Sequence, residues 1–299
     1  MKVCCIINSR SGSSAQSCGA EVTALFAHHN VSVKISEPNK NQSFSALAAE
    51  ACEEGFDTIV AVGGDGTINA VASALAGNPN VKMGVIPRGT LNHFARDLRI
   101  PTDMGNAIES IISGNVMSVD VGEVNEVIFI NNSSVGLYPA LVRLRESLQK
   151  KGLSKWSAAA WAALRLLIKY RTLTLDLLPF AGSKMRATTP MLFVGNNTYD
   201  TSFPSLGTRA ALDEGWLWIT APKTGTRFQF LSFALKIIMG QETAADALVL
   251  KAKTLTVTSR RSLVHVAVDG EVVRLKSPLI YKTRPKSLRV IVPMTHEEP

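Results

Sequence analysis

Residues 63–67, Gly-Gly-Asp-Gly-Thr, have the composition of a loop that binds phosphate. The apolar run Ile59–Val62 predicts a strand directly before them, and Ile68–Leu75 predicts a helix directly after them. Glycine has no Cβ, so the backbone N–H groups of such a loop can approach a polyphosphate closely, while Thr67 can cap the helix. Asp65 can hold a Mg²⁺ ion or its water ligands against the phosphates. A plain turn between strand and helix is the alternative interpretation.

A second strand, loop and helix follow at residues 83–98. Their loop contains Gly89, Thr90 and Asn92, and adjacent glycine loops at strand ends predict one nucleotide site. A third polar loop, Asn8–Gly12, follows the first strand. From turn chemistry alone, this third loop is equally consistent with an ordinary turn.

Two carboxylates, Asp269 and Glu271, flank Gly270 directly after a predicted strand at 265–268. Phosphoryl transfer to a hydroxyl needs a group that accepts the hydroxyl proton, and this pair is the best candidate in the sequence. Asp-Gly is also a common hairpin turn, so a purely structural role stays open. Asp213 and its neighbour Glu214 form a second acidic turn, which by itself is weak support for a metal site.

A chain of 299 residues predicts two domains. Strands and helices alternate up to about residue 123, which predicts a parallel sheet covered by helices on both faces. From residue 124 onward the chain has short strands with alternating faces, which is typical of an antiparallel sandwich.

The charge is unevenly distributed. Residues 1–142 carry a net charge of −5, whereas residues 143–171 hold eight Lys and Arg residues and one Glu, a net charge of +7. Such a segment suits anionic lipid or nucleic acid equally well on charge alone. The predicted helix 156–170 places Arg165 and Lys169 on one face, so it is interpreted either as a membrane-surface helix or as a core helix that covers the sandwich.

The sequence shows neither a secretory signal nor about twenty consecutive apolar residues of the kind that span a bilayer. All four cysteines lie in the first 52 residues, and reduced buried thiols are favoured over a zinc site. We therefore expect a cytoplasmic protein.

The loops resemble those of the diacylglycerol kinase and sphingosine kinase superfamily, and especially its bacterial lipid kinases. That superfamily carries an Asn-Pro-x-Ser-Gly start, then Gly-Gly-Asp-Gly-Thr, then Pro-x-Gly-Thr-x-Asn-Asp-Phe-Ala. The likeness continues through Asp120, the segment 129–136, the acidic turn at 213–215 and the turn at 269–271, so it covers nearly the whole chain.

The resemblance implies a Rossmann-like nucleotide-binding α/β domain at 1–123 and an antiparallel β-sandwich, lipid-substrate domain at 124–299, with the active site in the cleft between them. It implies an ATP-dependent lipid kinase that uses Mg²⁺ and phosphorylates a hydroxyl of diacylglycerol or a related lipid at an anionic membrane surface, with no nucleic acid partner. The implied roles are catalysis by Asp65, Asp269 as the general base and Glu271; nucleotide binding by Asn8, Gly12, Gly63, Gly64, Asp65, Gly66, Thr67, Gly89, Thr90 and Asn92; and metal binding by Asp65, Asp213 and Glu271.

Three departures from the superfamily pattern bear on the phosphate and metal groups. Ser9 and Ser13 stand where relatives often have Pro and Lys, and His93 stands where they often have Asp. Two alternatives therefore stay open. The first is a dinucleotide kinase similar to the NAD kinases, which share the Gly-Gly-Asp-Gly loop. The second is a nucleotide-gated lipid-binding protein, which would not need the charges that relatives carry at positions 13 and 93.

Overall fold

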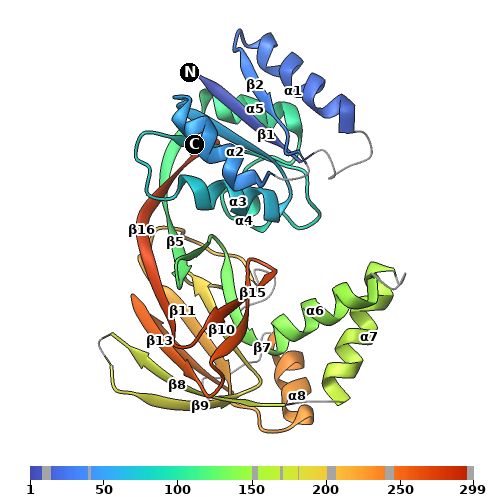
Figure 1. Cartoon of the computed structure of the whole chain (residues 1–299), viewed down its shortest axis with the longest axis vertical. Coiled ribbons are helices and arrows are strands. Elements are labelled where there is room, and N and C mark those ends of the chain that lie inside the picture. The colour runs from blue at the N-terminus through green and yellow to red at the C-terminus, as the bar shows by residue number, and fades with distance from the viewer. Residues whose placement is uncertain are drawn as a thin grey trace. The chain divides into compact units, whose positions relative to one another are not determined.

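The computed structural model describes residues 1–8, 15–39, 42–149, 154–168, 171–180, 182–200, 207–239 and 246–294. The chain forms two compact units, one of Met1–Val121 with the described part of Pro285–Pro299, and one of Gly122–Arg284 (Figure 1). The expected ranges 1–123 and 124–299 therefore need a correction. The chain returns to the first unit after Arg284, because the end of β16 (Leu279–Val292) pairs in parallel with β4 (Lys82–Pro87).

The first unit is built on a parallel sheet in the order β2-β1-β3-β4. The strands β1 and β3 are buried at every position, as expected for strands covered on both faces, and Figure 1 shows helices on either side of them. The helices α1 and α5 share one apolar core with the sheet, and α2 packs against α3. The bounds are β1 Val3–Ile7, α1 Ala15–His28, β2 Val33–Ser36, α2 Phe44–Glu53, β3 Thr58–Gly63, α3 Asp65–Leu75, α4 His93–Asp97, α5 Met104–Ser113 and β5 Asn115–Val124.

Two helices of this unit, α2 and α5, begin at a side-chain cap, Ser43 and Asp103 respectively. Asp103 accepts a hydrogen bond from the Asn106 backbone N–H at 3.0 Å, which caps α5 as its sequence predicts. The expectation that Thr67 caps the next helix is wrong. The helix α3 begins at Asp65, with Gly64 as its extended N-cap, so Thr67 lies inside the first turn.

The second unit contains two antiparallel sheets around one apolar core. The first sheet has the order β12-β11-β10-β7-β14-β15, and the other joins the start of β16 to β13, β8 and β9. Alternate residues of both sheets point into the shared core, which confirms the predicted sandwich. The bounds are β6 Val127–Phe129, β7 Asn132–Gly136, β8 Leu173–Pro179, β9 Met185–Thr189, β10 Met191–Asn196, β11 Leu217–Pro222, β12 Ala247–Ala252, β13 Thr254–Ser259, β14 Leu263–Val268 and β15 Glu271–Lys276.

In the described part of this unit, the helices α6 (Leu137–Gln149), α7 (Lys155–Ile168) and α8 (Arg227–Ile238) accompany the six-stranded sheet (Figure 1). The helix α7 matches the predicted helix 156–170, whose last two residues lie outside the described ranges. It buries Ala158 and Ala162, while Trp161 and Ile168 remain 61% and 63% exposed. One face of α7 is therefore packed and the other presents apolar side chains to solvent. None of the helices in the described part of the chain is long and apolar enough to cross a membrane.

Candidate active site

The two glycine loops of the first unit are in direct contact. A Cβ on Gly89 would lie 2.8 Å from the Cα of Gly64, so no side chain fits between the loops. The backbone N–H of Arg88 also donates to the Gly63 carbonyl at 2.8 Å. The predicted meeting of these loops at neighbouring strand ends is therefore present in the structure, and glycine is needed for this close approach.

Asp65 has one carboxylate oxygen in use and one without a partner. Its Oδ2 accepts a hydrogen bond from the Asn92 backbone N–H at 3.0 Å. Its Oδ1 is buried and has no hydrogen-bond partner among the described residues, and the same is true of Oδ1 of Asn69, four residues further along the same helix face. Buried oxygens without partners are costly, so these two atoms favour a bound cation or a donor from a ligand.

The donor set at Asp65 is compatible with Mg²⁺. This ion is often bound through one or two carboxylates, with water and substrate phosphates as its other ligands. The described ranges contain no cluster of three His, Cys, Asp or Glu side chains that would form an all-protein site. Asp65 with Asn69 thus fits an ion that is shared with a triphosphate.

Asn92 holds the second loop in shape. Its Oδ1 accepts from the Gly89 backbone N–H at 2.9 Å, and its Nδ2 donates to the Gly89 carbonyl at 3.0 Å. Its own backbone is left-handed, with φ of 49°. Because both amide atoms already bond to the loop, Asn92 positions the backbone around Gly89.

The remaining candidates in the first unit lie around these loops. Asn8 Nδ2 donates to Thr67 Oγ1 at 3.1 Å, which links the end of β1 to the first glycine loop. Gly66, Thr90 and His93 are exposed. Gly12, like Ser9 and Ser13, lies outside the described residues.

In the second unit, Asp269 occupies the two-residue turn between β14 and β15, with a positive φ of 45°. Its Oδ2 accepts from the Ile130 backbone N–H at 2.8 Å, and its Oδ1 accepts from the N–H groups of Asn131 and Asn132, each at 2.9 Å. Burial raises the pKa of Asp269 to about 6, although the three backbone donors and Arg209 act in the opposite direction. The hairpin turn that the sequence left open is present, and its Asp side chain is fixed by donors from the β6–β7 connection and from the first residue of β7.

Arg209 is a buried cation that the sequence did not reveal. Only 4% of the residue is exposed, and its guanidinium group donates to the Ile130 carbonyl at 2.6 Å and to Asn131 Oδ1 at 2.7 Å. Asn196 Nδ2 donates to the same Ile130 carbonyl at 3.0 Å. Arg209 and Asn196 therefore hold the backbone and side chain of residues 130 and 131 in place. A single Arg with no motif around it gave no signal in the sequence.

The other predicted acidic residues of this unit lie on the surface. Glu271 is exposed at the start of β15, and Asp213 is exposed in its turn. Glu214 accepts hydrogen bonds from the backbone N–H and the hydroxyl of Thr198, and Lys251 Nζ lies 3.9 Å from its Oε2. These contacts with Thr198 and Lys251 hold the 213–215 turn in place.

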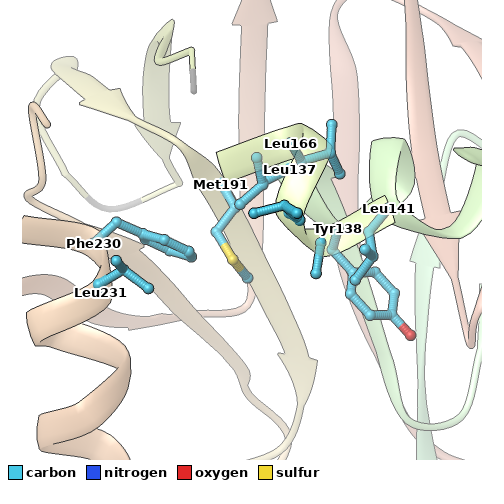
Figure 2. A pocket seen from close by; sticks show the side chains of 9 residues that line it. Leu137, Tyr138, Leu141, Leu166, Met191, Phe230 and Leu231 are labelled. Carbon is cyan, nitrogen blue, oxygen red and sulfur yellow. The ribbon is translucent and has the colours of Figure 1, made fainter. Parts of the chain in front are cut away.

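An apolar pocket of about 320 Å³ lies between α6, α7, α8 and β10. Figure 2 shows Met191 of β10 between Phe230 of α8 and the leucines of α6 and α7. The hydroxyl group of Tyr138 is the main polar feature of its lining, which consists of Leu137, Tyr138, Leu141, Ala163, Leu164, Leu166, Met191, Phe230 and Leu231. Such a lining suits a hydrocarbon chain.

Comparison with known proteins identifies both parts of the chain. Residues 2–124 match the family described as the diacylglycerol kinase catalytic domain, and residues 146–292 match the YegS C-terminal NAD kinase beta sandwich-like domain. A "Diacylglycerol kinase" of Staphylococcus aureus (strain bovine RF122 / ET3-1) is 30% identical over 226 residues, which are 75% of this chain and 71% of the relative. The chain belongs to the diacylglycerol kinase family. The resemblance noted in the sequence is thereby confirmed.

Solved structures place this diacylglycerol kinase family member among proteins of the same fold. A putative diacylglycerol kinase from Bacillus anthracis has a TM-score of 0.77 at 22% identity, with 97% of both chains covered. An NAD kinase from Archaeoglobus fulgidus in complex with ATP has a TM-score of 0.53 at 14% identity, with 98% of this chain and 94% of the other covered. At these identities the likeness concerns the fold alone.

Proposed function

We propose that this member of the diacylglycerol kinase family transfers the γ-phosphoryl group of ATP to a hydroxyl of diacylglycerol or a closely related lipid. The apolar pocket carries this proposal. Its lining offers an acyl chain an apolar environment, whereas the phosphates and riboses of a dinucleotide would find few polar partners there. The pocket therefore favours a lipid acceptor over a dinucleotide acceptor.

The glycine loops supply the phosphate side of the proposed reaction. The backbone N–H groups at Gly63, Gly64 and Gly66 stabilise negative charge on the triphosphate at the start of α3. Asp65 and Asn69 offer buried oxygens to Mg²⁺, which supplies charge neutralisation during phosphoryl transfer when it is bound.

Asp269 is the proton acceptor in this proposal. Its two carboxylate oxygens offer about four lone-pair positions, and three of them accept backbone N–H groups. One position, on Oδ2, therefore remains for the substrate hydroxyl. A pKa of about 6 leaves the carboxylate ionised at neutral pH and close to the range that suits a general base. Glu271 is assigned to the metal or orienting role by family resemblance, and Asp213 to a second cation.

The membrane surface belongs to the same proposal. The basic segment 143–171 attracts anionic headgroups, and the exposed Trp161, Leu164 and Ile168 of α7 present apolar area to an interface. Peripheral association from the cytoplasm gives the enzyme access to a lipid that does not leave the bilayer.

The test is a direct assay of acceptors. Radiolabelled ATP is incubated with the protein and either a lipid extract or NAD⁺, with and without Mg²⁺, and products are identified by mass. We expect a phosphorylated lipid that requires Mg²⁺. Labelled NADP⁺ with no lipid product would establish the dinucleotide alternative, and lipid binding without any turnover would establish the non-catalytic one.

A further inference from the structure

A second pocket of the second unit, about 150 Å³ in volume, has three basic side chains in an otherwise largely apolar lining. We call it the arginine pocket and define it by Arg143, Arg261 and His265, which line it, and by Arg274, which contacts His265. Arg261, His265 and Arg274 have no role in the proposed reaction, and Arg143 is the first residue of the basic segment 143–171.

The fold brings these side chains together from separate elements. Arg143 comes from α6, which packs on β14 and β15, and Arg261 comes from the turn between β13 and β14. Arg274 is the register partner of His265 across the β14–β15 hairpin, and its Nε donates to His265 Nε2 at 3.3 Å. The grouping is therefore a product of tertiary structure, since Arg143 is distant in the sequence from the hairpin region that supplies the other three residues.

The positive charge of this cluster is not neutralised within the described part of the chain. None of the three guanidinium groups forms an ion pair there, whereas Arg186 and Arg284 of the same unit pair with Asp176 and Glu123. Like charges held around one space repel each other, and an anion removes that repulsion.

The positive charge of the three arginines also affects the pKa of His265. Burial lowers its pKa, and Arg143, Arg274 and Arg261 lower the pKa further. Since Nε2 accepts from Arg274, the imidazole is neutral and its hydrogen is assigned to Nδ1. The pocket thus combines three cations with a neutral ring, and the described groups that face His265 contribute no negative charge.

We propose that the arginine pocket binds a phosphate group, supplied either by the headgroup of an anionic phospholipid or by free phosphate. Guanidinium groups bind phosphate oxygens in bidentate geometry, and a phosphate group fits a space of this volume. The helix α6 favours the lipid source, because Leu137 and Leu141 line the apolar pocket while Ala140 and Arg143 line this one. The proposal stands independently of the kinase assignment.

The first experiment measures binding of inorganic phosphate to the full chain by calorimetry. The double variant Arg261→Gln/Arg274→Gln is expected to bind about tenfold more weakly or worse, because hydrogen bonds to charged groups each contribute that order of affinity. Arg260→Gln is the matched control, since it removes one charge from the same turn and its side chain is not part of the pocket lining. The single variant Arg261→Gln is also compared with Arg260→Gln, because each of these two variants removes one positive charge.

The second experiment follows the His265 ring by NMR during a pH titration, with His265→Gln used to assign the signal. Bound phosphate offsets the three arginines, so saturating phosphate is expected to raise the pKa of His265. Monomeric short-chain phosphatidate that displaces phosphate would identify a lipid headgroup as the source, and phosphate binding without displacement would identify the free anion. Equal weakening by Arg260→Gln and Arg261→Gln, or a His265 pKa that phosphate leaves unchanged, would overturn the proposal.

Discussion

Asp65 is the residue whose charge the proposed phosphoryl transfer needs most directly. In Asp65→Asn the oxygen that accepts from the Asn92 N–H can be retained, while the charge at the unpartnered Oδ1 is lost. We therefore expect the turnover number to fall by at least about 100-fold, a change of roughly 3 kcal/mol in barrier, with the unfolding midpoint nearly unchanged. Steady-state kinetics and thermal unfolding measure the two. Turnover within about threefold of the parent would refute the role.

Replacing Asp269 is expected to affect both turnover and stability, because its carboxylate also accepts hydrogen bonds from the backbone N–H groups of residues 130–132. An Asn side chain has one acceptor oxygen, so Asp269→Asn points an NH₂ group at a backbone N–H. We expect the turnover number to fall about 10²–10⁴-fold with nucleotide affinity nearly unchanged, together with a stability loss on the order of 1–3 kcal/mol. Kinetics and urea unfolding separate these effects. A raised Michaelis constant for the nucleotide alone would make Asp269 a binding group.

Exposed Glu271 is the comparison for that variant, since Glu271→Gln removes a charge two residues away and leaves the three backbone hydrogen bonds in place. We expect it to weaken the Mg²⁺ dependence with little change in stability.

The pKa of Asp269 predicts opposite pH trends for activity and stability. Because burial raises it from 3.8 to about 6, the folded state holds this proton more tightly than the unfolded state between those values. Stability from this group is fully present below pH 3.8 and is lost as the pH rises through 6. The base works only when it is ionised, so kcat/KM is expected to fall below about pH 6. Urea unfolding of the parent against Asp269→Asn isolates the stability effect, and a difference that stays constant over this range would contradict it.

At the residue scale, the sequence predicted the side chains that belong to local motifs. The glycines at 63, 64 and 89 could be predicted because a tight loop requires them. Arg209 and Asn69 could not, because burial and the partners of a polar group are set by elements far away in the chain.

At the scale of elements, apolar strands such as β3 and β14 were predicted because their composition alone specifies a buried strand. The strand β7, Asn-Ser-Ser-Val-Gly, was missed because its composition is polar. It is a strand because β10 and β14 pair with its two edges, and the Ser133 hydroxyl finds a partner in the Tyr281 hydroxyl at 3.2 Å. Neighbouring strands thus override local propensity.

The apolar pocket depends on the same tertiary arrangement, and filling it tests its role. Leu141→Trp places a larger ring among the α6, α7 and β10 side chains, so we expect the Michaelis constant for the lipid to rise about tenfold or more while that for ATP stays the same. The matched control is Leu178→Trp, since Leu178 is 46% exposed on β8 and does not line the pocket. An unchanged Michaelis constant for the lipid would show that the acyl chains bind elsewhere.

At the scale of the whole molecule, the two-domain plan could be predicted from length and from the change in strand pattern. The return of the C-terminal strand to the first unit could not. It depends on the pairing of Val290 with Met83, residues that are distant in the sequence and ordinary in type.

The charge distribution leads to the last prediction, which concerns membrane binding. Because residues 143–171 carry a net charge of +7, binding of the protein to vesicles is expected to increase with anionic lipid and to decrease with salt.

The exposed Trp161 and Ile168 are expected to add apolar contacts, each on the order of 1.5–3 kcal/mol if fully buried in the interface. Trp161→Glu/Ile168→Glu should therefore weaken binding by at least about tenfold. Val249→Glu, at an exposed apolar residue of β12, is the control and should bind almost as the parent does. Vesicle flotation measures both. Equal binding to neutral and anionic vesicles, together with tight salt-sensitive binding of DNA, would assign the basic segment to nucleic acid.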